Sequence, residues 1–159
     1  MEYRTATIDD LELLCELRIE VLCAANLLPV GTPMPDVKAQ TRSYYLKALS
    51  DDTHVTYLAF DGDVVAGCGS VSFYQVMPTY NTPSGWHAYF MNMYTRPAYR
   101  RKRIGMTLLD LLVRESYGRG ITAIALEASE AGRNLYRSYG FVASADEMYL
   151  PFDAVRTMK

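Results

Sequence analysis

The sequence contains few residues of the kinds that bind metals or form disulfides. Its 159 residues include three cysteines and two histidines. Cys15, Cys23 and Cys68 lie in apolar patterns without the spacing of metal ligands, so we expect buried free thiols. His54 and His87 stand alone in the sequence, and we therefore predict no metal site.

Long apolar runs are also absent. No segment approaches the roughly 20 apolar residues that a membrane-spanning helix needs. Residues 1–4 form no apolar signal region. We therefore expect a cytoplasmic protein that does not bind membranes.

Neither sign of charge is in excess. The sequence has 16 Lys and Arg residues and 18 Asp and Glu residues, which gives a net charge of −2. This balance argues against a general binder of nucleic acids or membrane surfaces. The length and the apolar content of 50% predict one domain over residues 1–159. Against this background, the four consecutive cations at residues 100–103 are conspicuous.

Hydrophobic periodicity predicts a mixed α/β layer protein, in which antiparallel strands precede a β-α-β crossover. We expect Asp10 to complete a capping box with Thr7, Asp36 to cap the second helix, and Gly140 to end the fourth in a left-handed conformation. The strands are expected at residues 3–7, 54–60, 64–76, 86–95, 121–127 and 147–150, and the helices at about 11–23, 36–49, 103–117 and 131–139.

Residues 93–106 combine a strand end, a proline turn, a cluster of cations and the start of an amphipathic helix. The first N–H groups of a helix have no partner within it, and the helix dipole favours negative charge there. This pattern predicts a site for a phosphate-bearing ligand. Two alternatives remain for residues 100–103: a solvated charge run, and a nuclear-localisation or nucleic-acid patch, which the negative net charge disfavours.

Four segments in this order resemble the GNAT superfamily of N-acetyltransferases over essentially the whole chain. They are the strand and turn at 92–100, the loop at 100–105 (against the pattern Gln/Arg-x-x-Gly-x-Gly/Ala), the helix at 108–112, and residues 132–141 with a Tyr and a Gly-Phe. The resemblance implies an α/β fold with a central, mixed, mostly antiparallel twisted sheet of about six to seven strands and about four helices. It also implies acetyl-CoA as co-substrate and an amine as acetyl acceptor.

The resemblance assigns the coenzyme A contacts to three segments. The backbone of Met93, Tyr94 and Thr95 is expected to pair with the amides of the pantetheine arm. Ser129 and Arg133 belong to the closing segment. The phosphates are expected at the N–H groups and cations of the loop and first helical turn, namely Arg100, Arg101, Lys102, Arg103, Ile104, Gly105 and Met106.

Two positions depart from the family pattern. Arg103 stands where the first glycine of the loop is expected. We expect it to adopt ordinary helical dihedral angles and to add charge. Ser129 stands where the family often has Asn, and its hydroxyl can replace one amide contact but not two.

Acetyl transfer from a thioester needs a neutral amine, a donor for the developing oxyanion, and a proton for the departing thiolate. By resemblance, Tyr136 supplies that proton. Its alternative role is that of a core tyrosine on a half-buried helix. The backbone N–H of Met93 or Tyr94 is the expected oxyanion donor.

The general base is less defined by the sequence. His87 is the histidine nearest the expected site, and its ordinary pKa near ~6.5 suits the role. Its alternative role is an exposed histidine at a loop edge, and Glu127 and Glu130 are other candidate bases. Asn92 is expected to orient the acceptor or a water molecule.

The sequence thus predicts an acetyl-CoA-dependent N-acetyltransferase that acts by direct attack in a ternary complex. The acceptor is expected to be a small-molecule, amino-acid-like or peptide amine, because the variable segments at 28–35 and 74–86 carry few charges. Glu16 and Glu20 either attract a cation or form a solvated face. Two alternatives are a non-catalytic acyl-CoA-binding or regulatory module and a phosphate-binding interaction module. A homodimer is a further expectation, since dimers are common in the family.

Overall fold

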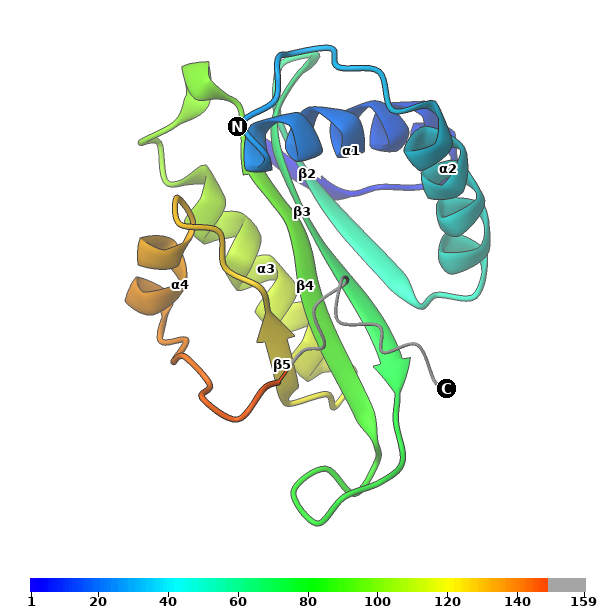
Figure 1. The fold of residues 1–159 in the computed structure, drawn as a ribbon, viewed down its shortest axis with the longest axis vertical. Coiled ribbons are helices and arrows are strands. Elements are labelled where there is room, and N and C mark those ends of the chain that lie inside the picture. Colours follow the sequence, from blue (N-terminus) through cyan, green and yellow to red (C-terminus); the bar gives the residue numbers. More distant parts are fainter. Residues whose placement is uncertain (149–159) are drawn as a thin grey trace, which may run out of the picture.

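The computed structural model describes residues 1–148, in which a five-stranded sheet lies between helices (Figure 1). The strand order is β1-β2-β3-β4-β5. The first four strands are antiparallel to their neighbours and β5 is parallel to β4. The strands are β1 (Glu2–Thr5), β2 (His54–Asp61), β3 (Val64–Gln75), β4 (Trp86–Thr95) and β5 (Ala123–Leu126). The helices are α1 (Leu11–Ala25), α2 (Pro35–Ser50), α3 (Ile104–Gly118) and α4 (Arg133–Tyr139), with 3-10 turns η1 (Ile8–Asp10) and η2 (Pro97–Tyr99).

The predicted mixed, mostly antiparallel sheet with helices around it is confirmed, with fewer strands than expected. Residues 147 and 148 of the expected last strand have no regular structure, and the rest of that strand lies outside the described residues. Val142 and Met148 are 90% and 98% exposed, so this stretch buries too little apolar surface to form a strand on the described core. No helix in residues 1–148 combines the length and the apolar character needed to cross a membrane.

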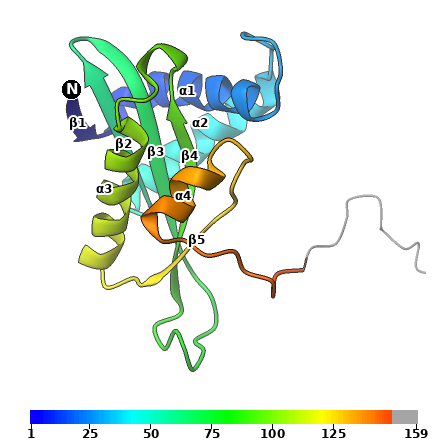
Figure 2. The ribbon, with the colours of Figure 1, turned by 90° about the vertical axis from the view of Figure 1, so that its left-hand side faces the viewer.

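Helices cover both faces of the sheet. Figure 2 shows α1 and α2 on one face and α3 on the other, with α4 following β5. The core under α1 includes the inaccessible side chains of Leu14 and Leu58, and the core under α3 includes Phe90 and Leu112. The three cysteines are free and buried, as expected.

β4 contains a bulge that decides where a ligand can bind. Cys68 of β3 pairs with Tyr94, but Ser70 pairs with Met91, so Asn92 and Met93 together face a single residue, Gly69. Asn92 has a φ of +57°, a left-handed conformation that asparagine tolerates better than most residues. A Cβ atom on Gly69 would lie 2.6 Å from the Met93 sulfur, so a side chain there would displace that of Met93.

The pairing of β4 with β5 stops just before the bulge. Within residues 1–148, β5 pairs with β4 only from His87 to Phe90. Beyond Phe90 this edge of β4 continues without a strand beside it, as the upper part of Figure 1 shows. Its backbone N–H and C=O groups are therefore available to a ligand.

The helix ends confirm two of the local predictions and correct two others. The Thr7 N–H donates to the Asp10 carboxylate at 2.8 Å, and Gly140 ends α4 at a φ of +121°. Asp36 does not cap α2, because Pro35 already occupies the first helical position. Arg103 does not have helical angles. It precedes α3 at a φ of +62°, the conformation that the glycine of the family pattern adopts without strain.

Candidate active site

A cleft of about 620 Å³ follows the free edge of β4, and we call it the edge cleft. One wall is the C-terminal half of α1, and the opposite wall is the β5–α4 loop and α4. Its lining residues are Val21, Ala24, Ala25, Leu27, Met93, Tyr94, Thr95, Arg100, Gly105, Ser129, Glu130, Ala131, Gly132, Leu135 and Tyr136.

Seven of the predicted site residues meet in this cleft. They are Met93, Tyr94, Thr95, Arg100, Gly105, Ser129 and Tyr136. They come from four separate parts of the chain: β4, the basic loop, α3 and the β5–α4 segment. The sequence order alone does not show that α4 faces β4 across the cleft, and the fold supplies that relation.

The basic loop ends beside the cleft at the N-terminus of α3. Since α3 begins at Ile104, the N–H groups of Ile104, Gly105 and Met106 belong to its first turn, where helical N–H groups have no intrahelical acceptor. Arg101 has a φ of +65°, so two left-handed residues turn the chain sharply before the helix. This arrangement is suited to bind an anion.

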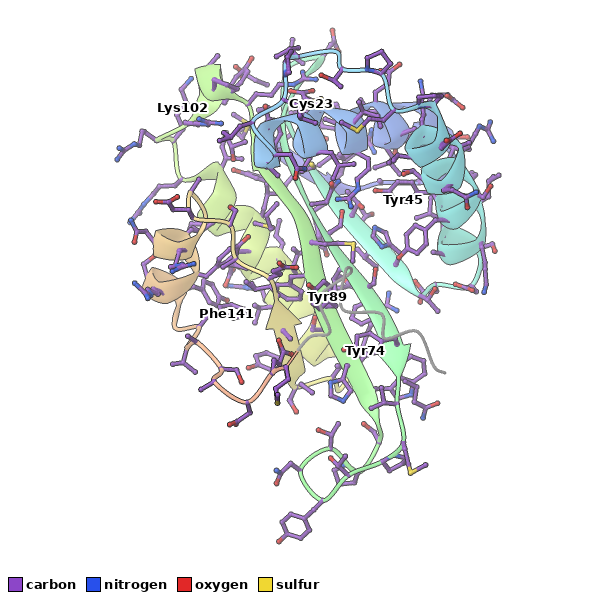
Figure 3. All side chains as sticks on the ribbon, viewed as in Figure 1. Cys23, Tyr45, Tyr74, Tyr89, Lys102 and Phe141 are labelled. Carbon is purple, nitrogen blue, oxygen red and sulfur yellow. The ribbon has the colours of Figure 1, made fainter. Side chains whose placement is uncertain are left out.

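The remaining predicted phosphate-binding side chains lie outside the lining. Ile104 is buried in the core, so only its backbone is available to a ligand. The Lys102 ammonium lies over the Tyr99 ring, 5.0 Å from its centre, on the outer side of the loop (Figure 3). Arg101, Arg103, Met106 and Arg133 also do not line the edge cleft.

Tyr136 faces the cleft from α4 and is 8% exposed. Its ring meets the Phe141 ring edge-on, with the ring centres 6.0 Å apart. Burial raises the pKa of the Tyr136 phenol above its ordinary value of 10.0. The phenol therefore keeps its proton at neutral pH and remains a hydrogen-bond and proton donor in the cleft.

Ser129 has a structural contact as well as its place in the cleft wall. Its hydroxyl oxygen accepts from the Gly132 N–H at 3.2 Å, just before α4 begins. A Cβ atom on Gly132 would lie 2.9 Å from the Tyr136 ring. Ser129 and Gly132 thus help to position Tyr136 against the cleft.

An ion pair fixes the α1 wall. The Arg96 guanidinium donates to the Glu20 carboxylate, with the shortest contact 2.9 Å, and also to the Val65 carbonyl at 2.8 Å. Of the two acids considered for a cation, Glu20 is therefore occupied by Arg96 and Glu16 is exposed. The ion pair holds α1 to the end of β4, where the edge cleft opens.

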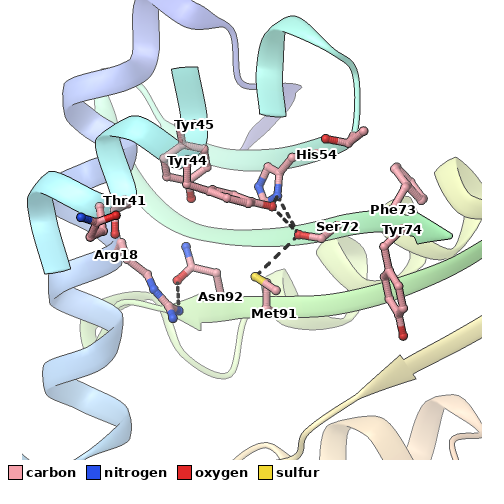
Figure 4. Close-up of a pocket in the computed structure, with 12 residues that line it drawn as sticks. Arg18, Thr41, Tyr44, Tyr45, His54, Ser72, Phe73, Tyr74, Met91 and Asn92 are labelled. Carbon is pink, nitrogen blue, oxygen red and sulfur yellow. Dashed lines mark hydrogen bonds between the residues drawn. The ribbon is translucent and has the colours of Figure 1, made fainter. Parts of the chain in front are cut away.

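A second cleft of about 470 Å³ lies between α2 and the sheet, and we call it the α2 cleft (Figure 4). Helix α1 contributes Arg18 to its wall. Its full lining is Arg18, Gln40, Thr41, Tyr44, Tyr45, Thr53, His54, Ser72, Phe73, Tyr74, Met91 and Asn92.

A chain of hydrogen bonds runs from this cleft into the sheet. The Tyr44 hydroxyl lies 2.6 Å from Ser72 Oγ and 3.0 Å from His54 Nδ1, and His54 Nε2 lies 2.9 Å from Thr56 Oγ1. The chain continues to Ser70 Oγ, 2.7 Å from Thr56 Oγ1. Burial lowers the pKa of His54 from 6.5 to about 4, so the imidazole is neutral at pH 7. A neutral His54 can accept one hydrogen bond and donate another.

The bulge joins the two clefts. Asn92 lines the α2 cleft, whereas its neighbour Met93 lines the edge cleft. Asn92 Oδ1 accepts from the Arg18 guanidinium at 3.2 Å, and the Cys68 thiol donates to the Asn92 carbonyl at 3.3 Å. A molecule in each cleft would therefore meet the other at this part of β4.

The structure does not bring His87 into either cleft. It lies five residues before Asn92, about 17 Å along an extended strand. Its ring stacks on the Tyr74 ring, with the centres 5.5 Å apart, and its buried Nε2 has no hydrogen-bond partner among residues 1–148. Of the other candidate bases, Glu130 lines the edge cleft and Glu127 lines neither cleft.

Several polar residues of the α2 cleft were not singled out for this site by the sequence, among them Arg18, Tyr44, His54 and Ser72. Only Arg18 had a readable signal, since it falls between Leu14 and Val21 on the buried stripe of α1, where a cation is unexpected. Within residues 1–148, no three or more His, Cys, Asp or Glu residues gather as metal ligands.

The open strand edge beside a basic loop at a helix N-terminus is suited to a ligand that combines a phosphate with a hydrogen-bonding chain. Residues 24–141 match the acetyltransferase (GNAT) family, and the chain belongs to this family. No curated protein sequence matches the chain significantly.

Solved structures agree with this assignment. A predicted acetyltransferase from Clostridium acetobutylicum, solved with acetyl-CoA, is 30% identical, with a TM-score of 0.87 over 94% of this chain and 95% of that one. A GCN5-related N-acetyltransferase from Ralstonia eutropha is 27% identical, with a TM-score of 0.80 over 96% and 98%. Glucosamine-6-phosphate N-acetyltransferase from Arabidopsis thaliana shares the fold at 17% identity, with a TM-score of 0.68 over 96% and 100%.

Proposed function

We propose that the protein transfers the acetyl group of acetyl-CoA to an amine by direct attack in a ternary complex. The observation that carries this proposal is the bulge at Asn92, which leaves the β4 edge open between the basic loop and Tyr136. The relative from Clostridium acetobutylicum contains acetyl-CoA, which supports the same ligand here.

Acetyl-CoA is placed along the edge cleft. Its pyrophosphate meets the N–H groups at the start of α3, and the cations of the loop approach the remaining phosphate. Its pantetheine amides pair with the backbone from Met93 to Thr95. The thioester then lies near Met93, within reach of an amine that enters from the α2 cleft.

The neutral amine attacks the thioester carbonyl carbon, and the carbonyl oxygen becomes an oxyanion near the N–H of Met93 or Tyr94. When the tetrahedral intermediate collapses, the C–S bond breaks and the Tyr136 phenol gives its proton to the sulfur. The proton lost by the amine passes to water, and the Tyr136 phenolate regains a proton from water. The products are an amide and free coenzyme A.

Proximity can supply most of the acceleration. Holding an amine and a thioester in attack geometry contributes up to roughly 7–11 kcal/mol in favourable cases. A dedicated base is therefore not required. Asn92 keeps its proposed role of orienting the acceptor, since it lines the cleft from which the amine approaches.

The test has two steps. Calorimetric titration with acetyl-CoA, coenzyme A and ATP should show saturable binding of the first two and much weaker binding of ATP, which lacks the pantetheine arm. Amines are then screened by thiol release. Binding of coenzyme A with no turnover of any amine would favour the non-catalytic acyl-CoA-binding module, and no binding would remove the proposal.

A further inference from the structure

The α2 cleft has an unbalanced charge. Its lining includes Arg18 and no Asp, Glu or Lys. Arg18 is half-buried, and among residues 1–148 it forms no ion pair. One N–H of its guanidinium donates to Asn92. A guanidinium has five N–H donors, so Arg18 retains donors for an anionic ligand.

Nearby acids do not neutralise this charge. Glu20, on the same helix, is held by Arg96 at 2.9 Å, and Glu16 is exposed on the outer side of α1. His54 is neutral at pH 7 and adds no charge. The α2 cleft is therefore suited to an anion and unsuited to a polycation.

The rest of the cleft wall is largely aromatic or apolar. Tyr44 and Tyr45 come from α2, Phe73 and Tyr74 from β3, and Met91 from β4 (Figure 4). The hydroxyls of Tyr44 and Ser72 are hydrogen-bonded to each other and to His54. A ligand with an uncharged, apolar part fits this wall better than a sugar with many hydroxyls.

The position of Arg18 limits the shape of the ligand. Its guanidinium contacts Asn92, the bulge residue, and the next residue, Met93, belongs to the edge where the thioester is proposed to lie. An anion bound by Arg18 therefore lies close to the attacking amine. In an α-amino acid one carbon separates the amine from the carboxylate, and the side chain is free to point elsewhere.

We propose that the acetyl acceptor is a free α-amino acid with an uncharged, apolar side chain, whose carboxylate is bound by Arg18 and whose side chain lies in the α2 cleft. This inference rests on the proposed acetyl transfer and adds the substrate class. A planar carboxylate can accept two parallel N–H bonds from the guanidinium, whereas the N-terminus of a peptide has no carboxylate one carbon from its amine.

The experiment compares acceptors that differ in one group. Thiol release is measured with the L-amino acids, and the best of them is compared with its amide, its decarboxylated amine, a dipeptide that begins with it, and glucosamine 6-phosphate. We expect the free amino acid to have the highest kcat/KM. The same assays are run on Arg18→Gln, on Arg18→Lys, and on Arg42→Gln, a control arginine that pairs with Glu12 outside both clefts.

Loss of a charge-assisted bond predicts that Arg18→Gln raises the KM for the amino acid by about 10- to 100-fold. It should leave the KM for the amide and the dissociation constant of coenzyme A nearly unchanged. The KM of Arg18→Lys for the amino acid should lie between those of wild type and Arg18→Gln, because lysine keeps the charge but lacks the planar guanidinium. Arg42→Gln should behave as wild type.

The outcomes separate this inference from the proposed function. Preference for the amide, the amine, the dipeptide or the amino-sugar phosphate overturns the amino-acid assignment and leaves acetyl transfer intact. So does coenzyme A binding without turnover of any amino acid, or an equal effect of Arg18→Gln on the acid and the amide. Absence of coenzyme A binding overturns the proposed function itself.

Discussion

At the scale of single residues, Tyr136 is the side chain that we propose protonates the departing thiolate. It is nearly buried at the wall of the edge cleft, and its raised pKa keeps the phenol protonated. Tyr139, three residues later, has a different environment, because its hydroxyl donates to Asp110 on α3 at 3.1 Å. The two tyrosines therefore form a matched pair for mutagenesis.

We expect Tyr136→Phe to lower kcat by about 100-fold, at the lower end of the usual contribution of acid–base catalysis. The dissociation constant of coenzyme A should hardly change, since the phenol is not among the proposed phosphate or pantetheine contacts. Steady-state kinetics and calorimetry measure the two quantities. Tyr139→Phe should retain turnover, and equal rates for the two variants would remove Tyr136 from the mechanism.

Arg103 adopts a left-handed conformation that costs a non-glycine residue roughly 1–2 kcal/mol. We expect Arg103→Gly to raise the free energy of unfolding by about 1 kcal/mol, because glycine relieves this strain. Arg103→Ala should not stabilise, since it removes the charge and keeps the strain. Thermal unfolding of both variants separates the backbone effect from the charge effect, and equal stability would show that φ at Arg103 carries no cost.

At the scale of elements, the N-terminus of α3 depends on one small residue. A Cβ atom on Gly105 would lie 3.3 Å from the Leu135 side chain of α4, and Gly105 also lines the edge cleft. A β-branched residue at position 105 would extend into the space where coenzyme A and its phosphates are proposed to lie.

Gly105→Val should weaken coenzyme A binding by at least 100-fold, by displacing the ligand from the helix start. Gly118→Val is the control, because Gly118 ends the same helix and a Cβ atom there meets nothing within 4 Å. Calorimetric titration measures the affinities, and thermal unfolding checks that each variant folds. Unchanged affinity in Gly105→Val would contradict the proposed place of the pyrophosphate.

Much of this element structure could be predicted from sequence. The β-branched and aromatic residues of β2 and β3, the turn at 61–63 and the apolar stripe of α3 are all local signals, and the helices lie within a few residues of their expected positions. The Asn92 bulge could not be predicted, since an extra residue in a strand leaves no mark in local composition. The left-handed φ of Arg103 could not be predicted either, because the turn before α3 imposes it against the preference of a non-glycine residue.

Only part of the candidate site could be predicted, because only that part comes from continuous segments of the sequence. The residues of the edge cleft belong to continuous motifs, whereas the α2 cleft is assembled from α1, α2, β2, β3 and β4. His54 stands alone in the sequence, and only the pairing of β2 with β3 places Ser72 beside it. Only the folded chain brings Arg18 to Asn92, its hydrogen-bond partner 74 residues later in the sequence.

At the scale of the whole molecule, the buried imidazole of His54 makes stability depend on pH. In the unfolded chain the pKa is near 6.5, whereas in the folded protein burial lowers it to about 4. Between these values the unfolded state binds a proton that the folded state does not. Stability is therefore fully present above pH 6.5 and falls as the pH drops toward 4.

The size of this effect is about 3 kcal/mol between pH 7 and pH 4, taken from the separation of the two pKa values. Chemical denaturation at pH 7, 5.5 and 4 measures it in wild type and in His54→Gln. The variant should be less stable at pH 7 but should lose less stability on acidification. A parallel loss in both proteins would assign the acid sensitivity to carboxylates such as Asp10, whose pKa the Arg4 guanidinium lowers.

The bulge at Asn92 also changes which residues of β4 point to each face of the sheet. Ala88 and Phe90 belong to the core on the α3 side of the sheet, and so does Met93, whereas Tyr94 packs on the α1 side. Even-numbered residues face α3 before the bulge and odd-numbered ones after it. In an unbroken strand Met91 and Met93 would share one face. The inserted residue instead lets Met91 and Asn92 line the α2 cleft while Met93 lines the edge cleft. If β4 straightened with Asn92 taken into the regular register, each later residue of the strand would turn to the opposite face, whereas deletion of Asn92 would keep the present faces in an unbroken alternation.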